Sequence, residues 1–403
     1  MSNMADNFAS EYRQLLGNGI VDTAYPVDGL LVQLPNGWHG IHEVLKGFSA
    51  RLGNYGYTLE MIPSICTPDT YANLPPEISE GVVDKAFPVT HTGFTKLDIP
   101  YLMGARPDLI VPQIEKLTAR SYKNLPVRRI CDGFRYFKMD APEYYPLITD
   151  LEQSAIDAVG IFYSEEEFEA EIAKLLGDFE AIARDLLRIS TFTVKHARGV
   201  SVYTTIPNGT VLEIVKVRNF GRSLSEAISF TVLGPDNRQA APFIFDFHID
   251  SRTFAASVVA HANGTNVVLP SALTRSHAVS FGVDCSAFTT VRVDKLSGQY
   301  SDERFAKLKM QGVVFALLPA ENGVLVKGDD LEQVVPQENL EGFLAEILER
   351  RDAQLTEKEK ALFQERMSAV QIIESEAPVE KSLGVLIEGG VTTNKQVVAQ
   401  TLI

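Results

Sequence analysis

Four short runs decide the fold class of this chain: VSVYTTI (200–206), VLEIVKVRNF (211–220), AISFTVL (227–233) and APFIFDFHI (241–249). They are rich in β-branched and aromatic residues, which favour strands. Turn residues separate them, as in Pro207-Asn208-Gly209. Helical patterns precede these runs and do not alternate with them. The chain is therefore predicted to be an α+β protein with an antiparallel sheet.

Working outward toward the N-terminus, apolar residues at helical spacing predict a helix over 37–53 that ends at Gly53. A second helix is predicted over 164–190, with Ser164 as its N-cap and acidic residues in its first turn. Shorter elements complete this half: a buried strand within 56–68, a helix near 109–120 and a strand at Pro126–Ile130.

Toward the C-terminus, the chain is expected to leave the first domain near Leu269-Pro270. A second α/β segment is predicted over 280–365, ending in a charged helix over 338–368. These patterns divide the chain into a domain over 1–272, a smaller one over 273–370 and a tail over 371–403.

Composition limits the classes of function. The 403 residues carry 37 Lys and Arg against 52 Asp and Glu, a formal net charge of −15, which disfavours general nucleic-acid binding. The three cysteines are far apart, the N-terminus does not resemble a signal peptide, and no apolar run is long enough to span a membrane. A cytoplasmic location is expected.

The sequence contains few of the standard catalytic and binding motifs. No Gly-Lys dipeptide occurs, so a Walker-type phosphate loop is excluded. His39 and His42 lie three residues apart on a predicted helix, but no third metal ligand is near them in sequence. We therefore expect surface or interface histidines there, and no metal site.

The order of several segments is more informative. They are YPVDGLLVQLPNGWHGIHEVLKGF (25–48), GYTLEMIP (56–63), FPVTHTGFTKLDIPYLMGARPD (87–108), SYKNLPVR (121–128), IPNGTVLEIVKVRNFGRSLSEAISF (206–230) and DSRTFAASVVAHANGTNVVLP (250–270). In this order they resemble the catalytic domain of the prolyl-tRNA synthetases, most closely the archaeal and eukaryotic-cytosolic type. Residues 303–348 resemble the back half of the anticodon-binding domain of that family.

The resemblance implies a fold and an assembly. It implies a class II aminoacyl-tRNA synthetase catalytic domain, an antiparallel sheet flanked by helices, plus a reduced α/β anticodon-binding-like domain. The tail is expected to pack on the catalytic domain. Such domains usually pair as homodimers through the first class II motif, whose proline would be Pro63.

The resemblance also implies a nucleotide site. Class II synthetases activate a carboxylate with ATP, and arginines and Mg²⁺ stabilise the charge on the phosphates. Arg135 in F-R-Y-F matches the second-motif arginine, and Arg252 in D-S-R matches the third-motif arginine. We expect both to be catalytic and to bind ATP. Asp108, at the end of the ARPD segment, is expected to bind substrate.

Other positions depart from the family pattern. Phe137 stands where the family has a glutamate, and in the following stretch, PLITDLEQSAID (146–157), only Gln153 of the family's polar pattern remains. Gln153 is retained as a substrate-binding candidate. The loss of polar groups that grip the amino acid makes proline an unsuitable substrate.

Charged residues replace neutral ones at the centre of the expected site. Lys216 and Arg218 stand where the family has threonine and histidine, and their spacing places both side chains on one face of a strand. Glu213 replaces a glutamine; it and His248 are expected to bind substrate, and Asp250 is a candidate at the nucleotide. His248 replaces a glycine close to the nucleotide, and Asp250 adds negative charge there, so ATP is not expected to bind in the family's pose.

Two interpretations of these changes stay open. In one, Lys216 and Arg218 hold a small-molecule acid, including an anionic one, or a shifted phosphate. In the other, the site has decayed, and Glu213 and Asp250 are simply ion-pair partners of the cations.

Three functions follow, in order of preference. The first is a ligase that activates an amino or other carboxylic acid with ATP for a carrier protein or a small-molecule acceptor, in a biosynthetic pathway. The second is a catalytically inactive paralogue that serves as a regulatory or assembly subunit. The third is an authentic prolyl-tRNA synthetase, although the acidic surface and the reduced second domain disfavour tRNA as a partner.

Overall fold

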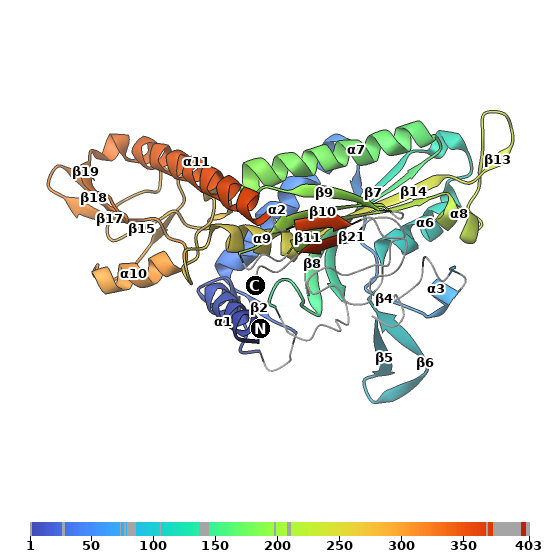
Figure 1. The fold of residues 1–403 in the computed structure, drawn as a ribbon, viewed down its shortest axis with the longest axis horizontal. Helices are drawn as coiled ribbons and strands as arrows, with labels where there is room; N and C mark the ends of the chain where they lie inside the picture. Colours follow the sequence, from blue (N-terminus) through green and yellow to red (C-terminus); the bar gives the residue numbers. More distant parts are fainter. Residues whose placement is uncertain are drawn as a thin grey trace.

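The computed structural model describes residues 2–25, 29–72, 74–75, 78, 86–104, 106–136, 145–196, 199–207, 211–367, 370–373 and 396–399. Its largest described sheet has seven strands in the order β3-β7-β8-β14-β11-β10-β9, with β3 parallel to β7 and every other pair antiparallel (Figure 1). In that order the strands span Thr58–Leu59, Val127–Tyr136, Glu152–Phe162, Phe243–Asp250, Val211–Gly221, Gly199–Thr205 and Phe192–His196.

Helices cover one face of this central sheet. Figure 1 shows α7 lying along the sheet with α2 beside it. The described helices are α1 (Ser2–Gly17), α2 (Pro35–Asn54), α3 (Asp69–Ala72), α6 (Pro107–Thr118), α7 (Glu165–Ile182), α8 (Ser223–Ala227), α9 (Ser251–His261), α10 (Asp302–Met310) and α11 (Leu340–Met367).

A second sheet forms a small α/β domain with α10 and the first half of α11. Its described strands have the order β16-β15-β17-β18-β19, with bounds Val293–Lys295, Ala278–Ser280, Phe315–Ala320, Gly323–Lys327 and Glu332–Val335. The connection from β15 to β16 contains no helix, and both strands have only three residues. The predicted second, small α/β domain is confirmed.

Among the residues that the structure describes, four small sheets lie outside these two. They are β1 (Val21–Asp22) with β2 (Val32–Gln33), β4 (Ile65–Cys66) with β6 (Thr95–Met103) and β5 (Phe87–Thr92), β12 (Val232–Leu233) with β13 (Gln239–Ala240), and β20 (Val370–Ile373) with β21 (Gln396–Ala399). The expected packing of the tail over 371–403 falls largely outside the described residues.

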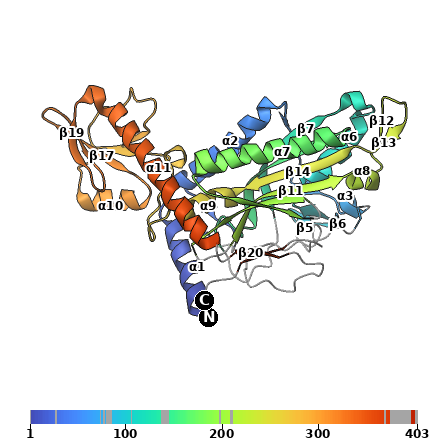
Figure 2. The ribbon, with the colours of Figure 1, turned by 45° about the horizontal axis from the view of Figure 1, so that its top comes forward.

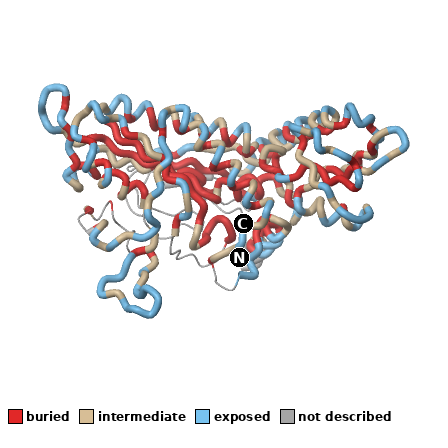
Figure 3. Tube along the Cα trace, turned by 180° about the vertical axis from the view of Figure 1, so that it is seen from behind, coloured by how far each residue is buried: buried red, intermediate tan, exposed pale blue. Residues whose placement is uncertain are grey.

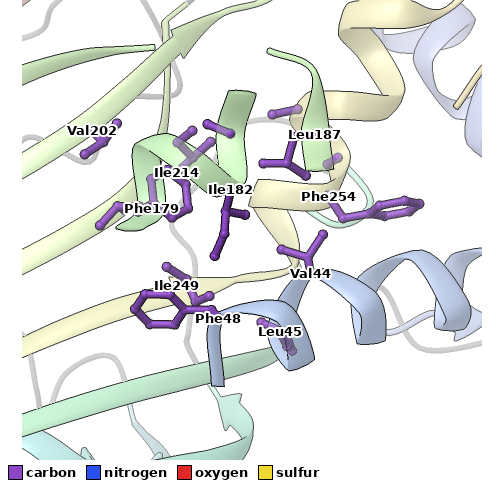
Figure 4. Packing of buried hydrophobic residues seen from close by; sticks show 14 of the residues in the cluster. Val44, Leu45, Phe48, Phe179, Ile182, Leu187, Val202, Ile214, Ile249 and Phe254 are labelled. Carbon is purple, nitrogen blue, oxygen red and sulfur yellow. The ribbon is translucent and has the colours of Figure 1, made fainter. Parts of the chain in front are cut away.

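Alternation along β14 explains how the sheet packs. Phe245, Phe247 and Ile249 point to the helices, and the ring of Phe247 stacks on Phe48 of α2 with centroids 5.1 Å apart. Figure 4 shows Phe48, Phe179 and Ile249 meeting in this apolar layer. In Figure 3 the buried segments follow the strands of the central sheet and the helices against it. The core therefore lies between the sheet and α2, α7 and α9.

Helix α11 joins the small domain to the edge of the central sheet, as Figure 2 shows. Glu359 accepts hydrogen bonds from the backbone N–H of Ser190 at 2.9 Å and from its hydroxyl at 2.7 Å. Farther along, Arg366 donates to the carbonyl of Thr205 at 3.3 Å. The charged helix predicted over 338–368 is confirmed, and it anchors one domain on the other.

Three predictions about local structure are wrong. Helix α2 continues through Gly53, and the left-handed glycine beyond it is Gly56, with φ of 79°. The buried strand expected within 56–68 is reduced to two strands of two residues, because its apolar side chains point away from the core. The run 227–233 forms mainly the end of α8 and a loop, in which Phe230 is a buried anchor.

The tight contact between α2 and α9 gives a test of this packing. A Cβ on Gly40 would lie 2.1 Å from the fully buried ring of Phe254, whereas a Cβ on Gly53 of the same helix meets nothing within 4 Å. We expect Gly40→Ala to lower the free energy of unfolding by roughly 1–3 kcal/mol through overpacking. Gly53→Ala should raise it by up to about 1 kcal/mol, since alanine favours the helix.

Chemical denaturation of both variants and of the wild type measures these changes. Equal stability of Gly40→Ala and Gly53→Ala would contradict the packing between α2 and α9.

Candidate active site

The second face of the central sheet is polar and still buried. Strand register places Asp157 of β8 directly opposite His248 of β14, which in turn is opposite Lys216 of β11. In the adjacent row, Asp246 of β14 is opposite Arg218 of β11. The expected common face of Lys216 and Arg218 is confirmed.

A continuous chain of ion pairs on this face, which we call the five-residue chain, links Arg135, Asp157, His248, Asp250 and Arg252. The Arg135 guanidinium donates to Asp157 at 2.7 Å, and Asp157 accepts from Nδ1 of His248 at 2.8 Å. Nε2 of His248 donates to Asp250 at 3.2 Å, and Arg252 donates to Asp250 at 2.9 Å. Each carboxylate therefore lies between one arginine and the same histidine.

Burial makes these charges depend on one another. Burial alone would raise the pKa of Asp157, but Arg135 and His248 outweigh it and hold that pKa well below its usual range. The same holds for Asp250, where Arg252 and His248 oppose burial. Burial would lower the pKa of His248, yet the two aspartates raise it to about 9. The histidine is therefore an imidazolium at neutral pH.

A second group of charges lies beside this chain. Arg218 donates to Asp246 at 2.5 Å and lies 3.9 Å from Asp108 of α6, which is also paired with Arg106. Burial would raise the pKa of Asp108, but Arg106 and Arg218 lower it. Burial, Asp157 and Asp108 together raise the pKa of Asp246 to about 8.

The remaining predicted site residues, Lys216, Glu213 and Gln153, do not belong to the five-residue chain. Lys216 lies 3.8 Å from Glu213, which also accepts a hydrogen bond from Ser201 at 2.5 Å. Gln153 is buried, and its amide donates to the carbonyl of Ile148 at 3.0 Å, so it holds the chain that leads into β8. Phe137 lies outside the described residues.

The two histidines considered for a metal site are separate from this cluster. The ring of His42 stacks on the exposed ring of Trp38 with centroids 5.9 Å apart, and burial lowers the pKa of His39. Within the part of the chain that the structure describes, no group of three or more His, Cys, Asp and Glu side chains is arranged to hold a metal ion.

Sequence reasoning missed Asp157, Asp246 and Arg106. The signal for Asp246 was present in FIFDFHID (243–250), where Asp246, His248 and Asp250 alternate with apolar residues. Such alternation normally indicates a solvent-facing side. Here all eight residues of β14 are buried, so the polar side faces other protein groups.

Known proteins resemble this chain in sequence and in structure. No family model matches the chain. The proline–tRNA ligase of Methanoculleus marisnigri is 26% identical over 278 residues, which cover 66% of this chain and 57% of the relative. That of Aeropyrum pernix is 22% identical over 390 residues, covering 87% of this chain and 79% of the relative. The Methanoculleus alignment thus spans under three-fifths of the relative's length.

Solved structures agree along most of the chain. Giardia lamblia prolyl-tRNA synthetase, in complex with prolyl-adenylate, superposes with a TM-score of 0.83 at 16% identity and covers 98% of both chains. The Cryptosporidium parvum enzyme, complexed with halofuginone and AMPPNP, gives 0.78 at 16% identity and covers 89% of this chain and 80% of that chain. The fold is therefore that of a class II aminoacyl-tRNA synthetase. With the sequence matches, the chain is a distant homologue of the prolyl-tRNA synthetases.

The arrangement can be tested for its fit to ATP and Mg²⁺. Arg135 and Arg252 each grip a carboxylate of the protein itself, the kind of anion that a phosphate group would replace. If both arginines turned to phosphates, His248 would still partner Asp157 and Asp250. Two guanidinium groups that already bind anions are donors of the type that fits a polyphosphate. Because Mg²⁺ in nucleotide sites is bound largely through phosphates and water, it would arrive with the nucleotide.

The crowding of the nucleotide by His248 stays a prediction, but the structure shows how this side chain is held. Its ring is only 3% exposed and is held within the row by two aspartates, and Asp250 is neutralised by Arg252. The added charges at these two positions therefore compensate each other.

The raised pKa of His248 predicts a pH dependence of stability. The native imidazolium titrates near pH 9 and the unfolded one near 6.5, so its contribution is complete below pH 6.5 and is lost as the pH rises through about 9. His248→Gln should therefore lower the free energy of unfolding most at neutral pH and less at high pH. Denaturant titrations across this window measure the difference.

His261→Gln is a matched control for this prediction. Burial lowers the pKa of His261 to about 4, so that side chain does not titrate in the same window. Above about pH 7 a constant deficit is therefore expected for it. A constant deficit for His248→Gln as well would show that His248 is not held as an imidazolium.

Proposed function

We propose that this protein is an adenylate-forming ligase that activates an amino or other carboxylic acid, distinct from proline, with ATP. The proposal depends on the five-residue chain. Arg135 and Arg252 lie at its opposite ends, and each is paired with an aspartate whose place a phosphate group would take. ATP, when bound, would supply the phosphoanhydride needed to form an acyl adenylate.

The roles of the protein's own residues follow from their partners. Arg135 is oriented by the carbonyl of Cys131 at 2.7 Å as well as by Asp157, so its guanidinium is held in position before a ligand arrives. Arg252 is at the start of α9, and Asp250 caps that helix by accepting from the Arg252 backbone N–H. When the arginines are engaged with phosphates, His248 still donates one hydrogen bond to each aspartate and compensates one of their two negative charges.

The acceptor is proposed to be a carrier protein or a small molecule, within a biosynthetic pathway. Two observations support this choice over tRNA. The chain has a net charge of −15, and the small domain lacks a helix between β15 and β16. Proline is disfavoured because Arg218, Asp108 and Asp246 make the expected amino-acid pocket charged.

Binding of Mg·ATP tests the proposal directly. Titration calorimetry should detect binding to the wild type at up to millimolar ATP, and Arg135→Ala and Arg252→Ala should each weaken it by about ten-fold or more, since a charge-assisted contact is lost. Arg238→Ala is the control, because that side chain is 86% exposed on a distant hairpin. A screen of acids for ATP–pyrophosphate exchange follows.

A second function is favoured by a different property of the same site. Every arginine on the polar face is already paired, so the cluster is stable without a ligand. On that basis the protein would be a catalytically inactive paralogue acting as a regulatory or assembly subunit. Failure to bind millimolar ATP would support this function and contradict the ligase. Proline-dependent charging of tRNA would contradict both.

We propose that the protein is a homodimer, with the segment around Pro63 at its interface. Support comes from large apolar side chains exposed there, with Leu59 65% and Met61 86% accessible. Leu59→Asp with Met61→Asp should convert a dimer to a monomer in light scattering, because charges at an apolar interface are costly. Phe94→Asp, at the fully exposed tip of the β5–β6 hairpin, is the control. A monomeric wild type would contradict the proposal.

A further inference from the structure

A strained and buried turn leads into strand β8. Residues 145–150 are all buried, and Leu147 has a φ of 64°, in the left-handed region that leucine rarely adopts. Hydrogen bonds within the turn support this shape, as where the Tyr145 N–H donates to the Thr149 hydroxyl at 2.7 Å. Strained backbone of this kind persists only where the surroundings hold it, and it is concentrated at functional sites.

The turn contacts both ends of the five-residue chain. On one side, the Ser251 hydroxyl donates to the carbonyl of Leu147 at 3.3 Å, and Ser251 directly precedes Arg252 at the start of α9. On the other side, the Gln153 amide donates to a carbonyl of the turn at 3.0 Å, and Gln153 is opposite Arg135 in the register of β7 and β8. The conformation of the turn therefore bears on the position of both arginines.

The peptide unit that joins Pro146 to Leu147 is held at both of its polar atoms. Its carbonyl accepts a hydrogen bond from the hydroxyl of Tyr12 at 2.6 Å, and its N–H donates to Asp150 at 2.8 Å. Because a peptide unit is planar, these two bonds together fix its orientation and with it the φ of Leu147. Tyr12 belongs to α1, outside the central sheet, and only 2% of it is exposed.

We propose that Tyr12 is a positioning residue for the nucleotide site, and that it acts through the turn at 145–150 on Arg252. Without the Tyr12 hydroxyl, the buried carbonyl loses this donor and the peptide unit can rotate toward an unstrained conformation of Leu147. The Leu147 carbonyl then turns away from Ser251, and the first turn of α9 no longer holds Arg252 ready for a phosphate. This role rests on the proposed binding of ATP, but the effect on the turn is measurable without a nucleotide.

Removal of one hydroxyl tests the role. Tyr12→Phe should weaken Mg·ATP binding, measured by titration calorimetry, about three- to ten-fold, the range expected for one hydrogen bond. Tyr300→Phe is the matched control, because it removes a hydroxyl that donates to Asp302 at 2.5 Å in the small domain, and it should leave binding unchanged. Wild-type affinity in Tyr12→Phe would overturn the proposal.

A double substitution tests the route through Ser251. Ser251→Ala removes the hydrogen bond between α9 and the turn, so adding Tyr12→Phe to it should change the ATP affinity little further. If the fold-losses of the two single variants instead multiply in the double variant, Tyr12 does not act through Ser251 and the proposal fails.

Hydrogen exchange in the nucleotide-free protein separates positioning from general stability. Tyr12→Phe should raise the exchange of the Leu147 amide, which is bonded to Asp150, and of the Arg252 amide, which is bonded to Asp250. Amides of β10, β11 and the small domain should keep their wild-type exchange. Faster exchange throughout the chain, or no change at the turn, would give Tyr12 a purely structural role and contradict the proposal.

The outcomes distinguish this role from the proposed function. If the wild type binds no ATP at millimolar concentration, but Tyr12→Phe loosens only the turn and the start of α9, the ligase is rejected and the control of Arg252 by Tyr12 is retained. If the wild type binds ATP and Tyr12→Phe binds it equally well, the ligase is retained and the positioning role is rejected.

Discussion

The polar half of this protein depends on the two hydrogen bonds that the His248 side chain makes to aspartates. This side chain is nearly inaccessible, and it joins Asp157 on β8 to Asp250 at the end of β14. Without the imidazolium each aspartate would keep one arginine but would lose its second side-chain donor, and a buried carboxylate with too few hydrogen bonds is costly. His248 thus completes the hydrogen bonding of two buried carboxylates on one face of the sheet.

The two faces of β14 show how the same strand serves stability and chemistry. Its aromatic residues face α2 and α7 and contribute to the core, while its charged residues face their partners on β8 and β11. A shift of one residue in register would exchange these faces. The apolar packing therefore also determines where the charges lie, and Phe247 and His248 are positioned by the same pairing.

The site differs from a phosphate-binding site with unpaired arginines, because its cations already hold anions of the protein itself. Such pairing is compatible with two outcomes. A ligand that supplies better-placed anions can take over the arginines, whereas a protein that never meets such a ligand keeps a cluster in which every arginine is paired. Asp246 and Glu213 each keep one buried carboxylate oxygen without a hydrogen-bond donor, so the compensation is incomplete at two of the acids.

The sequence by itself determined the α+β class, the main helices, the class II synthetase resemblance and the common face of Lys216 and Arg218, because these depend on local periodicity and on the order of segments. Only the tertiary structure decided which carboxylate partners each arginine. Asp157 lies 22 residues from Arg135 and 91 from His248, and no local pattern links such distant positions. The apolar run at 227–233 also took its final form from packing against α6 and β14, where burial of Phe230 outweighed strand propensity.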